Sequence, residues 1–323
     1  MTTTRIGISV GDPAGVGPET TAKAILQLHD LDLEFILFCE KDFFEELGRR
    51  FRWAADLVEL SLSAKRVTFA GSTRLGGHVP FGHPTPAGGR FAFDSFAEAT
   101  RAAIDGKIDA LVTAPLSKAC VEMAGIVPFS GHTEYLRDFA GVDRVVMMLL
   151  AGDFRVVPAT RHVPISSVPS MITNELIEGT IRITAESMAR FMGIERPAIG
   201  VLALNPHAGD SGLFGTEETT IESSVETLKA CGYDVRGPLV PDVAFIPRVR
   251  KQFDVIVGMF HDQVLIPLKM AGFERGVNAT LGLPFVRTSP DHGTAYDIAG
   301  TDSADSSSMI EAIRLAVEWC AAI

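Results

Sequence analysis

Short β-branched or aliphatic runs alternate with amphipathic helical segments along almost the whole chain of 323 residues. The runs expected to be buried strands span residues 5–10, 33–39, 109–113, 144–150, 154–159, 199–204 and 254–260. Helical periodicity is found over residues 93–106, 173–192, 216–231 and 303–322. Parallel strands need long crossover connections, usually helices, so this alternation predicts an α/β fold with a largely parallel sheet.

The length of the chain suits two lobes, because a chain of 323 residues is too long for one typical hydrophobic core. No Ser/Gly-rich linker separates two halves. A second α/β lobe is therefore expected to be inserted into the first and to share its sheet. The sequence marks no boundary, so residues 1–323 are interpreted as one chain of two interleaved lobes.

The net charge of −11 argues against a nucleic-acid partner, which would need a basic face. The most apolar run, residues 145–151, is far shorter than the ~20 residues that cross a bilayer, so no membrane association is expected. The cysteines at positions 39, 120, 231 and 320 show no CxxC spacing, and the first residues hold no apolar signal core. These features favour a cytoplasmic protein with reduced thiols.

Three histidines, His162, His207 and His261, each follow a run that is expected to be a strand. Strand ends are where open α/β sheets bind ligands. A single histidine in a loop is more often an ordinary loop or core residue than a metal ligand. Three histidines in the same kind of position instead predict one divalent-metal site. Three imidazoles with an open position describe a catalytic metal, and they favour zinc.

Glycine and proline mark the turns that follow several of these strands. The turn from Gly11 to Pro18 lacks the Lys-Ser/Thr ending of a P-loop and the spacing of a Rossmann fingerprint, so it is predicted to be a tight structural turn. Gly-His-Thr-Glu at residues 131–134 opens a helix. His132 and Thr133 are therefore expected near a helix start, where donors attract anions. A capping box is the alternative interpretation of the same residues, and both can hold.

Lys269, Asn278 and Arg287 lie in apolar surroundings and are the cationic and amide candidates for binding an anionic substrate. An isolated Lys or Arg is normally a solvated surface charge. A charge in an apolar segment is costly to bury without a partner, so such residues tend to have a ligand or an ion pair. Arg can grip a phosphate or carboxylate with two hydrogen bonds, whereas Lys acts as a point charge.

Five motifs occur in order between about Gly11 and Gly300, and together they resemble the 4-hydroxythreonine-4-phosphate dehydrogenase family. The motifs are Gly-Asp-Pro-Ala-Gly-Val-Gly-Pro-Glu from Gly11, Gly-His-Thr-Glu from Gly131, Asn-Pro-His-Ala-Gly from Asn205, His-Asp-Gln from His261, and the run from Gly276 to Ala295. The resemblance implies that the metal ligands are His162, His207 and His261. It implies that the substrate is bound by His132, Thr133, Lys269, Asn278 and Arg287.

The segment from Asp291 to Gly300 also resembles the cofactor loop of the isocitrate and isopropylmalate dehydrogenases. That superfamily binds NAD without a Rossmann fingerprint, and the resemblance implies that NAD, or NADP, is bound by His292, Gly293, Thr294 and Ala295. It further implies two α/β lobes that share a largely parallel, partly mixed sheet. The cleft between the lobes would be lined by residues near 132, 162, 207, 261 and 287.

The activity implied by the resemblance is a metal-dependent, NAD-linked oxidation and decarboxylation of 4-phosphooxy-L-threonine. The product is 3-amino-2-oxopropyl phosphate, an intermediate of pyridoxal 5'-phosphate (vitamin B6) synthesis. The metal would be Zn²⁺, with Mg²⁺, Mn²⁺ or Co²⁺ as alternatives, and either His132 or Asp242 would be the general acid or base. The family acts as a homodimer with the active site at the subunit interface, which implies that His261 completes the site of the other chain.

Two positions depart from the family pattern: Val264 replaces a glycine after His-Asp-Gln, and Val243 replaces a threonine after Asp242. They leave the substrate open, because similar dehydrogenases act on phosphorylated threonate or erythronate, or on an aromatic dihydrodiol. A different class is a zinc hydrolase, in which three histidines activate water and no NAD is needed. A third alternative is a phosphate-binding protein that needs neither metal nor NAD.

Overall fold

The structure, a computed structural model, describes residues 3–64, 66–75, 81–272 and 275–323. The chain divides into two compact units. Unit 1 comprises Met1–Asp143 and Leu283–Ala321, and unit 2 comprises Arg144–Gly282 with the last two residues. The chain thus leaves unit 1, builds unit 2 and returns to unit 1.

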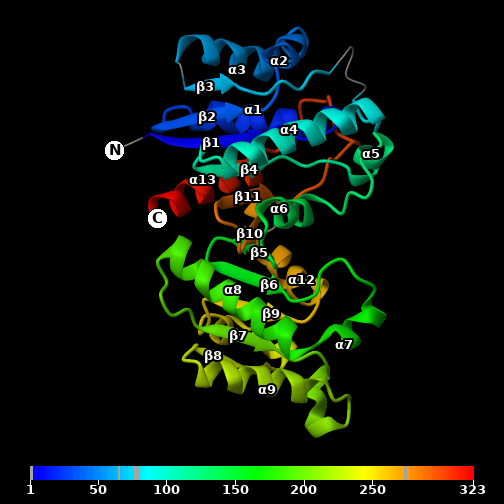
Figure 1. The fold of residues 1–323 in the computed structure, drawn as a ribbon, viewed down its shortest axis with the longest axis vertical. Helices are drawn as coiled ribbons and strands as arrows, with labels where there is room; N and C mark the ends of the chain where they lie inside the picture. The colour runs from blue at the N-terminus through cyan, green and yellow to red at the C-terminus, as the bar shows by residue number, and fades with distance from the viewer. Residues whose placement is uncertain (1–2, 65, 76–80, 273–274) are drawn as a thin grey trace. The chain divides into compact units, whose positions relative to one another are not determined.

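Unit 1 contains a fully parallel set of strands in the order β3-β2-β1-β4-β11 (Figure 1). The strands are β1 (Thr4–Ser9), β2 (Leu33–Leu37), β3 (Val67–Phe69), β4 (Ala110–Thr113) and β11 (Val286–Pro290). Most of their residues are apolar and fully buried, as strands covered on both faces should be.

The helices of unit 1 are α1 (Gly17–Leu28), α2 (Lys41–Gly48), α3 (Arg52–Ser63), α4 (Pro86–Ile104), α5 (Lys118–Met123), α6 (His132–Ala140) and α13 (Ser307–Ala321). Of these helices, α1 to α4 connect the parallel strands of unit 1, α5 and α6 follow β4, and α13 follows β11. Helix α13 packs on β11, β4 and β1, and the Thr288 hydroxyl of β11 donates to the Ala312 carbonyl of α13 over 2.8 Å. Side chains alternate along a strand, so Arg287, next to Thr288, points to the opposite face of the sheet.

Unit 2 contains strands of both directions in the order β10-β5-β6-β9-β7-β8. Strand β5 (Val146–Ala151) is antiparallel to β10 (Val277–Leu281) and to β6 (Phe154–Pro158). Strand β9 (Val255–Gly258) is parallel to β6 and to β7 (Ile199–Leu202), and β8 (Val235–Leu239) is parallel to β7. The prediction of an α/β fold with a mostly parallel, partly mixed sheet is therefore confirmed.

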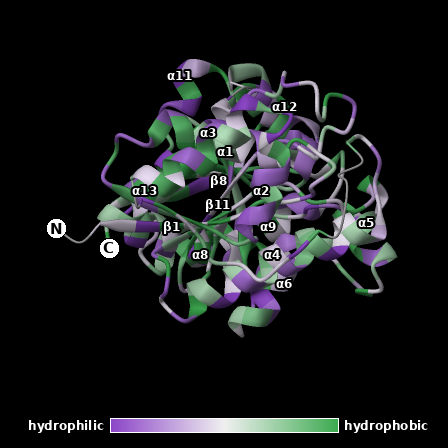
Figure 2. Ribbon diagram, turned by 90° about the horizontal axis from the view of Figure 1, so that it is seen from above, coloured by the Kyte–Doolittle hydropathy of each residue, from purple (hydrophilic) through white to green (hydrophobic). Residues whose placement is uncertain are grey.

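The helical segments of unit 2 pack on its strands or on one another. Its longer helices carry hydrophobic and hydrophilic residues on the same helix (Figure 2). The helical segments are η1 (Ile165–Ser167), α7 (Val168–Met171), α8 (Asn174–Met192), η2 (Pro206–Gly212), α9 (Glu217–Ala230), α10 (Pro241–Ala244), α11 (Pro247–Arg250) and α12 (His261–Gly272). Val264 of α12 is fully buried in the core, and a Cβ on Gly258 would lie 2.3 Å from its Cγ1. The valine that departs from the family pattern thus packs directly over the end of β9.

Candidate active site

The rings of His162 and His261 lie together at one end of the unit 2 strands, with centroids 5.6 Å apart. His162 follows β6, and His261 is the first residue of α12, just after β9. Because Pro158 and Gly258 are register partners, the two strands end side by side. The His261 Nδ1 is hydrogen-bonded to Asp262 over 2.6 Å, which leaves its Nε2 for a ligand.

Backbone and hydroxyl hydrogen bonds continue the pairing of β6 and β9 beyond the strand ends. The Ala159 N–H donates to the Gly258 carbonyl over 2.8 Å. The Thr160 N–H and hydroxyl both donate to the Met259 carbonyl, over 3.1 and 2.7 Å. Thr160 is buried, so these bonds are shielded from water. They fix the chain two residues before each of the two histidines.

His207 lies in η2, after β7, where the backbone is left-handed over several residues. The φ angles of His207, Ala208 and Asp210 are 52°, 53° and 43°. Non-glycine residues rarely adopt this conformation, and it persists only when surrounding contacts hold it. The contacts come from the buried Glu218 carboxylate of α9, which accepts the N–H of Leu204 and of Asn205 over 3.1 and 2.8 Å.

The structure does not gather His207 with the other two histidines into one cluster. Across residues 3–64, 66–75, 81–272 and 275–323, no group of three or more His, Cys, Asp or Glu side chains is arranged to hold a metal ion. The donor chemistry still fits a divalent metal, because three imidazoles lie on the segments that follow β6, β7 and β9. Within one chain, therefore, only two of the three predicted metal ligands, His162 and His261, lie close together.

The remaining predicted residues of unit 2 lie on three different elements. Asp242 is exposed in α10, which follows β8. Lys269 is half-buried in the last turn of α12, the helix that begins at His261. Asn278 lies on β10, opposite Leu149 of β5. The segments carrying Asp242 and Lys269 therefore both follow strands of the parallel part of unit 2.

In unit 1, His132 is the first residue of α6, as expected from the glycine before it. Gly131, the residue at the N-cap, has a φ of 121° and, as a glycine, no side chain that could cap the helix, so a capping box with a polar N-cap side chain is not observed. The His132 ring packs edge-on against Phe96 at a centroid distance of 4.5 Å. Its Nε2 is buried and has no hydrogen-bond partner among the described residues. Such an atom suits a polar ligand.

His132 lies in a cationic environment formed by Arg287 and Lys118. Burial, and then the charges of Arg287 and Lys118, lower the pKa of His132 well below its usual value. Its imidazole is therefore neutral at physiological pH. Arg287 is 2% exposed, its Nη2 donates to the Thr113 hydroxyl over 2.6 Å, and burial lowers its pKa to about 10. It remains charged, so this region of unit 1 can bind an anion.

The segment expected to bind NAD is supported by the turn that begins at Gly11. The Val16 N–H donates to the Thr294 carbonyl over 2.9 Å, and the Tyr296 hydroxyl donates to Asp12 over 2.6 Å. Nothing lies within 4 Å of a Cβ placed on Gly293. The His292 Nε2 is buried and has no hydrogen-bond partner in the part of the chain described. The open space and the buried nitrogen fit a cofactor at this loop.

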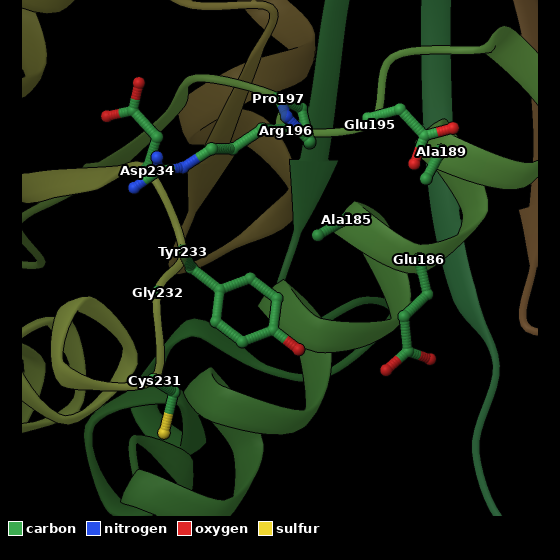
Figure 3. Close-up of a pocket in the computed structure, with 10 residues that line it drawn as sticks. All are labelled: Ala185, Glu186, Ala189, Glu195, Arg196, Pro197, Cys231, Gly232, Tyr233 and Asp234. Carbon is green, nitrogen blue, oxygen red and sulfur yellow. The ribbon is translucent and has the colours of Figure 1, made fainter.

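A separate pocket of about 250 Å³ lies in unit 2, between α8 and the turn from α9 to β8 (Figure 3). Its lining includes Glu186, Arg196, Cys231 and Tyr233. None of the predicted site residues lines it. This pocket is therefore distinct from the candidate active site.

In the described residues, no helix is both long and apolar enough to span a membrane.

Comparison with known proteins covers nearly the whole chain. A family model described as pyridoxal phosphate biosynthetic protein PdxA matches residues 22–316. The 4-hydroxythreonine-4-phosphate dehydrogenase of Sulfurihydrogenibium sp. is 38% identical over 323 residues, covering 97% of each chain. The crystal structure of the enzyme of that name from Klebsiella pneumoniae has a TM-score of 0.83 at 33% identity, covering 98% of this chain and 99% of that one. A terephthalate 1,2-cis-dihydrodiol dehydrogenase from Burkholderia xenovorans has a TM-score of 0.67 at 27% identity, covering 98% of both chains.

Proposed function

This chain belongs to the PdxA family of pyridoxal phosphate biosynthetic proteins and is an NAD-dependent dehydrogenase, and we propose that its substrate is 4-phosphooxy-L-threonine. The proposed reaction is oxidation of the secondary hydroxyl followed by decarboxylation, which gives 3-amino-2-oxopropyl phosphate. The reaction would serve vitamin B6 synthesis in the cytoplasm, where the four free cysteines would stay reduced.

The observation that carries the proposal is the buried cation beside a neutral imidazole in unit 1. Arg287 is buried and charged, and the neutral His132 has a buried Nε2 that faces no protein partner among the described residues. A phosphate or carboxylate oxygen could accept a hydrogen bond from the His132 Nε2 and be stabilised by the nearby charge of Arg287. Thr133, next to His132 in the first turn of α6, would add a hydroxyl near the same anion. Lys269 and Asn278 of unit 2 would bind the rest of the substrate.

The metal ligands in this proposal are His162, His207 and His261. A divalent cation held there, most suitably Zn²⁺, would lower the pKa of the substrate hydroxyl and polarise the carbonyl that forms after hydride transfer to NAD. The contribution of the chain is orientation: Asp262 fixes the His261 ring, and Glu218 holds the loop of His207. His292, Gly293, Thr294 and Ala295 would bind the adenine side of NAD.

Two groups of the chain are proposed to move protons. His132 can accept a proton as a general base, because its lowered pKa leaves the imidazole neutral at physiological pH. Asp242 is exposed at the start of α10 and would act only if substrate covers it. Substitution of each by Asn, followed by the pH profile of kcat/KM, identifies the one whose loss removes a limb of the profile.

We also propose that the enzyme is a homodimer with its active site at the subunit interface, with His261 completing the site of the other chain. Three imidazoles are needed, and one chain does not cluster three in its described residues. His162 and His261 of one chain lie 5.6 Å apart, so a site that takes both rings from one chain is the alternative that must be distinguished.

The decisive experiment follows the appearance of NADH when the purified protein is mixed with NAD and 4-phosphooxy-L-threonine. Parallel reactions contain phosphorylated threonate or erythronate, and a second series contains a chelator. We expect the threonine phosphate to give the highest kcat/KM and the chelator to abolish it. A higher kcat/KM on a sugar-acid phosphate would overturn the proposed substrate, and turnover that survives metal removal would overturn the metal dependence.

A further inference from the structure

A buried carboxylate in the turn after β1 is bound to a tyrosine of the cofactor loop. Asp12 is 0% exposed, and its Oδ2 accepts a hydrogen bond of 2.6 Å from the Tyr296 hydroxyl. Its Oδ1 accepts the Ala14 N–H over 2.9 Å. Both carboxylate oxygens therefore have donors, as a buried charge requires. Tyr296 directly follows Ala295, the last residue expected to contact NAD.

The same turn also contacts the loop through its backbone. The Val16 N–H donates to the Thr294 carbonyl over 2.9 Å, and a Cβ on Gly15 would lie 2.6 Å from that carbonyl oxygen. Only a residue without a side chain allows this approach. Val16 also packs in a small apolar cluster with Ala295. The turn thus contacts three consecutive residues of the loop: the carbonyl of Thr294, the side chain of Ala295 and the hydroxyl of Tyr296.

The residue between these contacts has an unfavourable backbone conformation. Ala295 has a φ of 42°, in the left-handed region that alanine seldom adopts. Such a conformation persists when its surroundings impose it, and it is common where ligands bind. Here the residues on both sides of Ala295 are held by hydrogen bonds, Thr294 to Val16 and Tyr296 to Asp12.

The hydrogen bond between Tyr296 and Asp12 is partly buried, and Tyr296 remains its donor. Burial, and then the hydrogen bond to Asp12, raise the pKa of Tyr296 above its usual value. The phenol therefore stays protonated and continues to donate. The Cys120 Sγ of α5 lies 3.3 Å from the same hydroxyl, so the ring is held from a third element.

We propose that Asp12 and Tyr296 are positioning residues that hold residues 292–295 in the conformation that binds NAD. Neither needs to touch the cofactor. A loop that is already ordered loses little conformational entropy when its ligand binds, so its affinity is higher. This inference rests on the proposed role of residues 292–295 in NAD binding. It adds that the turn beginning at Gly11, expected only to be structural, sets the affinity for NAD.

The test is Tyr296→Phe, which keeps the ring and removes only the hydroxyl. We expect the Kd and KM for NAD to rise roughly tenfold, the effect of losing a hydrogen bond to a charged group. The KM for the phosphorylated substrate and kcat at saturating NAD should change by less than about twofold. Tyr233→Phe is the matched control, because it removes the hydroxyl of a tyrosine in unit 2, and its Kd for NAD should equal that of the wild type.

An unchanged NAD Kd in folded Tyr296→Phe would overturn the inference. If wild-type protein does not bind NAD in calorimetry, the proposed function fails instead, so the two failures are distinct. Amide hydrogen exchange of the wild type provides a test that does not depend on any variant folding. We expect residues 292–296 to be protected before NAD is added and to gain little afterwards. Protection that appears only with NAD would show that the turn does not order the loop.

Discussion

The Nη2 of Arg287 donates a hydrogen bond of 2.6 Å to the hydroxyl of Thr113, which lies on the neighbouring parallel strand. The bond holds a guanidinium that is only 2% exposed, on the face of the sheet opposite α13. A buried cation is costly unless hydrogen bonds and opposite charges offset its desolvation, and the carboxylate of Glu134 is one charge that favours the protonated form of Arg287. The charge of Arg287, held beside Thr113, helps to lower the pKa of His132, the imidazole at which we propose that a phosphate or carboxylate binds.

Replacing Arg287 by Ala should weaken binding of the phosphorylated substrate. We expect KM to rise roughly 10- to 100-fold, because hydrogen bonds to a charged group are lost, while KM for NAD stays near its wild-type value. Arg287→Lys keeps the charge and should lie between the two. Arg90→Ala, which removes an exposed arginine of α4, is the control. Steady-state kinetics measure all four proteins. An unchanged KM in Arg287→Ala would mean that the arginine is only a structural cation.

Replacing His207 by Ala should lower metal content and turnover together, because one of three imidazole ligands is lost. We expect the affinity for the metal to fall by more than about 100-fold, beyond the loss caused by removing an indirect partner of a ligand. Metal stoichiometry after dialysis against a weak chelator gives the measurement. The exposed His29, whose Nδ1 contacts the Leu26 carbonyl, supplies the control variant His29→Ala. Wild-type stoichiometry in His207→Ala would remove His207 from the ligand set.

Mixing two inactive variants tests whether His261 acts on the site of the other chain. In a hybrid of a His162→Ala chain and a His261→Ala chain, one site would lack both histidines and the other would keep all its ligands. Random exchange should therefore restore about a quarter of the wild-type activity. No recovery, although mass spectrometry shows hybrids, would mean that both rings come from one chain, as their separation of 5.6 Å allows.

Most of the parallel strands of the fold could be predicted, because each of those is a short, continuous apolar run. Residues 109–113 were expected as a strand, and β4 spans Ala110–Thr113. Strands β10 and β11 were not predicted, although both are mostly buried. They carry Asn278 and Arg287 and are separated by Gly282 and Pro284, so their apolar pattern is interrupted by functional residues. The polar residues that suggested a binding site thus also obscured the apolar pattern of β10 and β11, the strands on which they lie.

The sequence offers candidates for the ligands of the site but no signal for the residues that would hold those ligands in place. His132 at the start of a helix follows from the glycine before it, and Figure 1 shows α6 beginning after a long connection from α5. The bond between Asp12 and Tyr296 joins residues 284 positions apart, and no local pattern relates them. The one available signal was an acidic residue in an otherwise apolar, glycine-rich turn. Contacts of this kind depend on how strands pair, which a single sequence does not specify.

Gln263 links the strand that leads to His261 with the strand that leads to His207. Its Oε1 accepts the Met259 N–H over 2.7 Å, and its Nε2 donates to the Ala203 carbonyl over 2.8 Å. Gln263→Glu keeps the acceptor and replaces the donor by a carboxylate oxygen that repels the carbonyl. We expect the metal affinity to fall roughly 10- to 100-fold, as for other indirect partners of metal ligands, with NAD binding unchanged.

The control for this variant is Gln252→Glu, which also removes an amide that donates to a carbonyl, here that of Arg248 at an exposed position. It should keep the wild-type metal affinity. Competition with a coloured chelator measures the affinity of all three proteins. Equal affinities for Gln263→Glu and Gln252→Glu would show that Gln263 stabilises the core without positioning the histidines.

The lowered pKa of His132 makes the stability of unit 1 depend on pH. Below the ordinary histidine pKa of about 6.5, the unfolded chain takes up a proton at this position while the folded chain does not. Acidification therefore favours unfolding, and the stability lost begins near that value and grows until the folded pKa is reached. His132→Gln removes the effect, so its urea midpoint should fall less than that of the wild type between about pH 7 and pH 5. His29→Gln, at an exposed histidine, should follow the wild type. Parallel midpoints for His132→Gln and the wild type would mean that folding does not lower the pKa of His132.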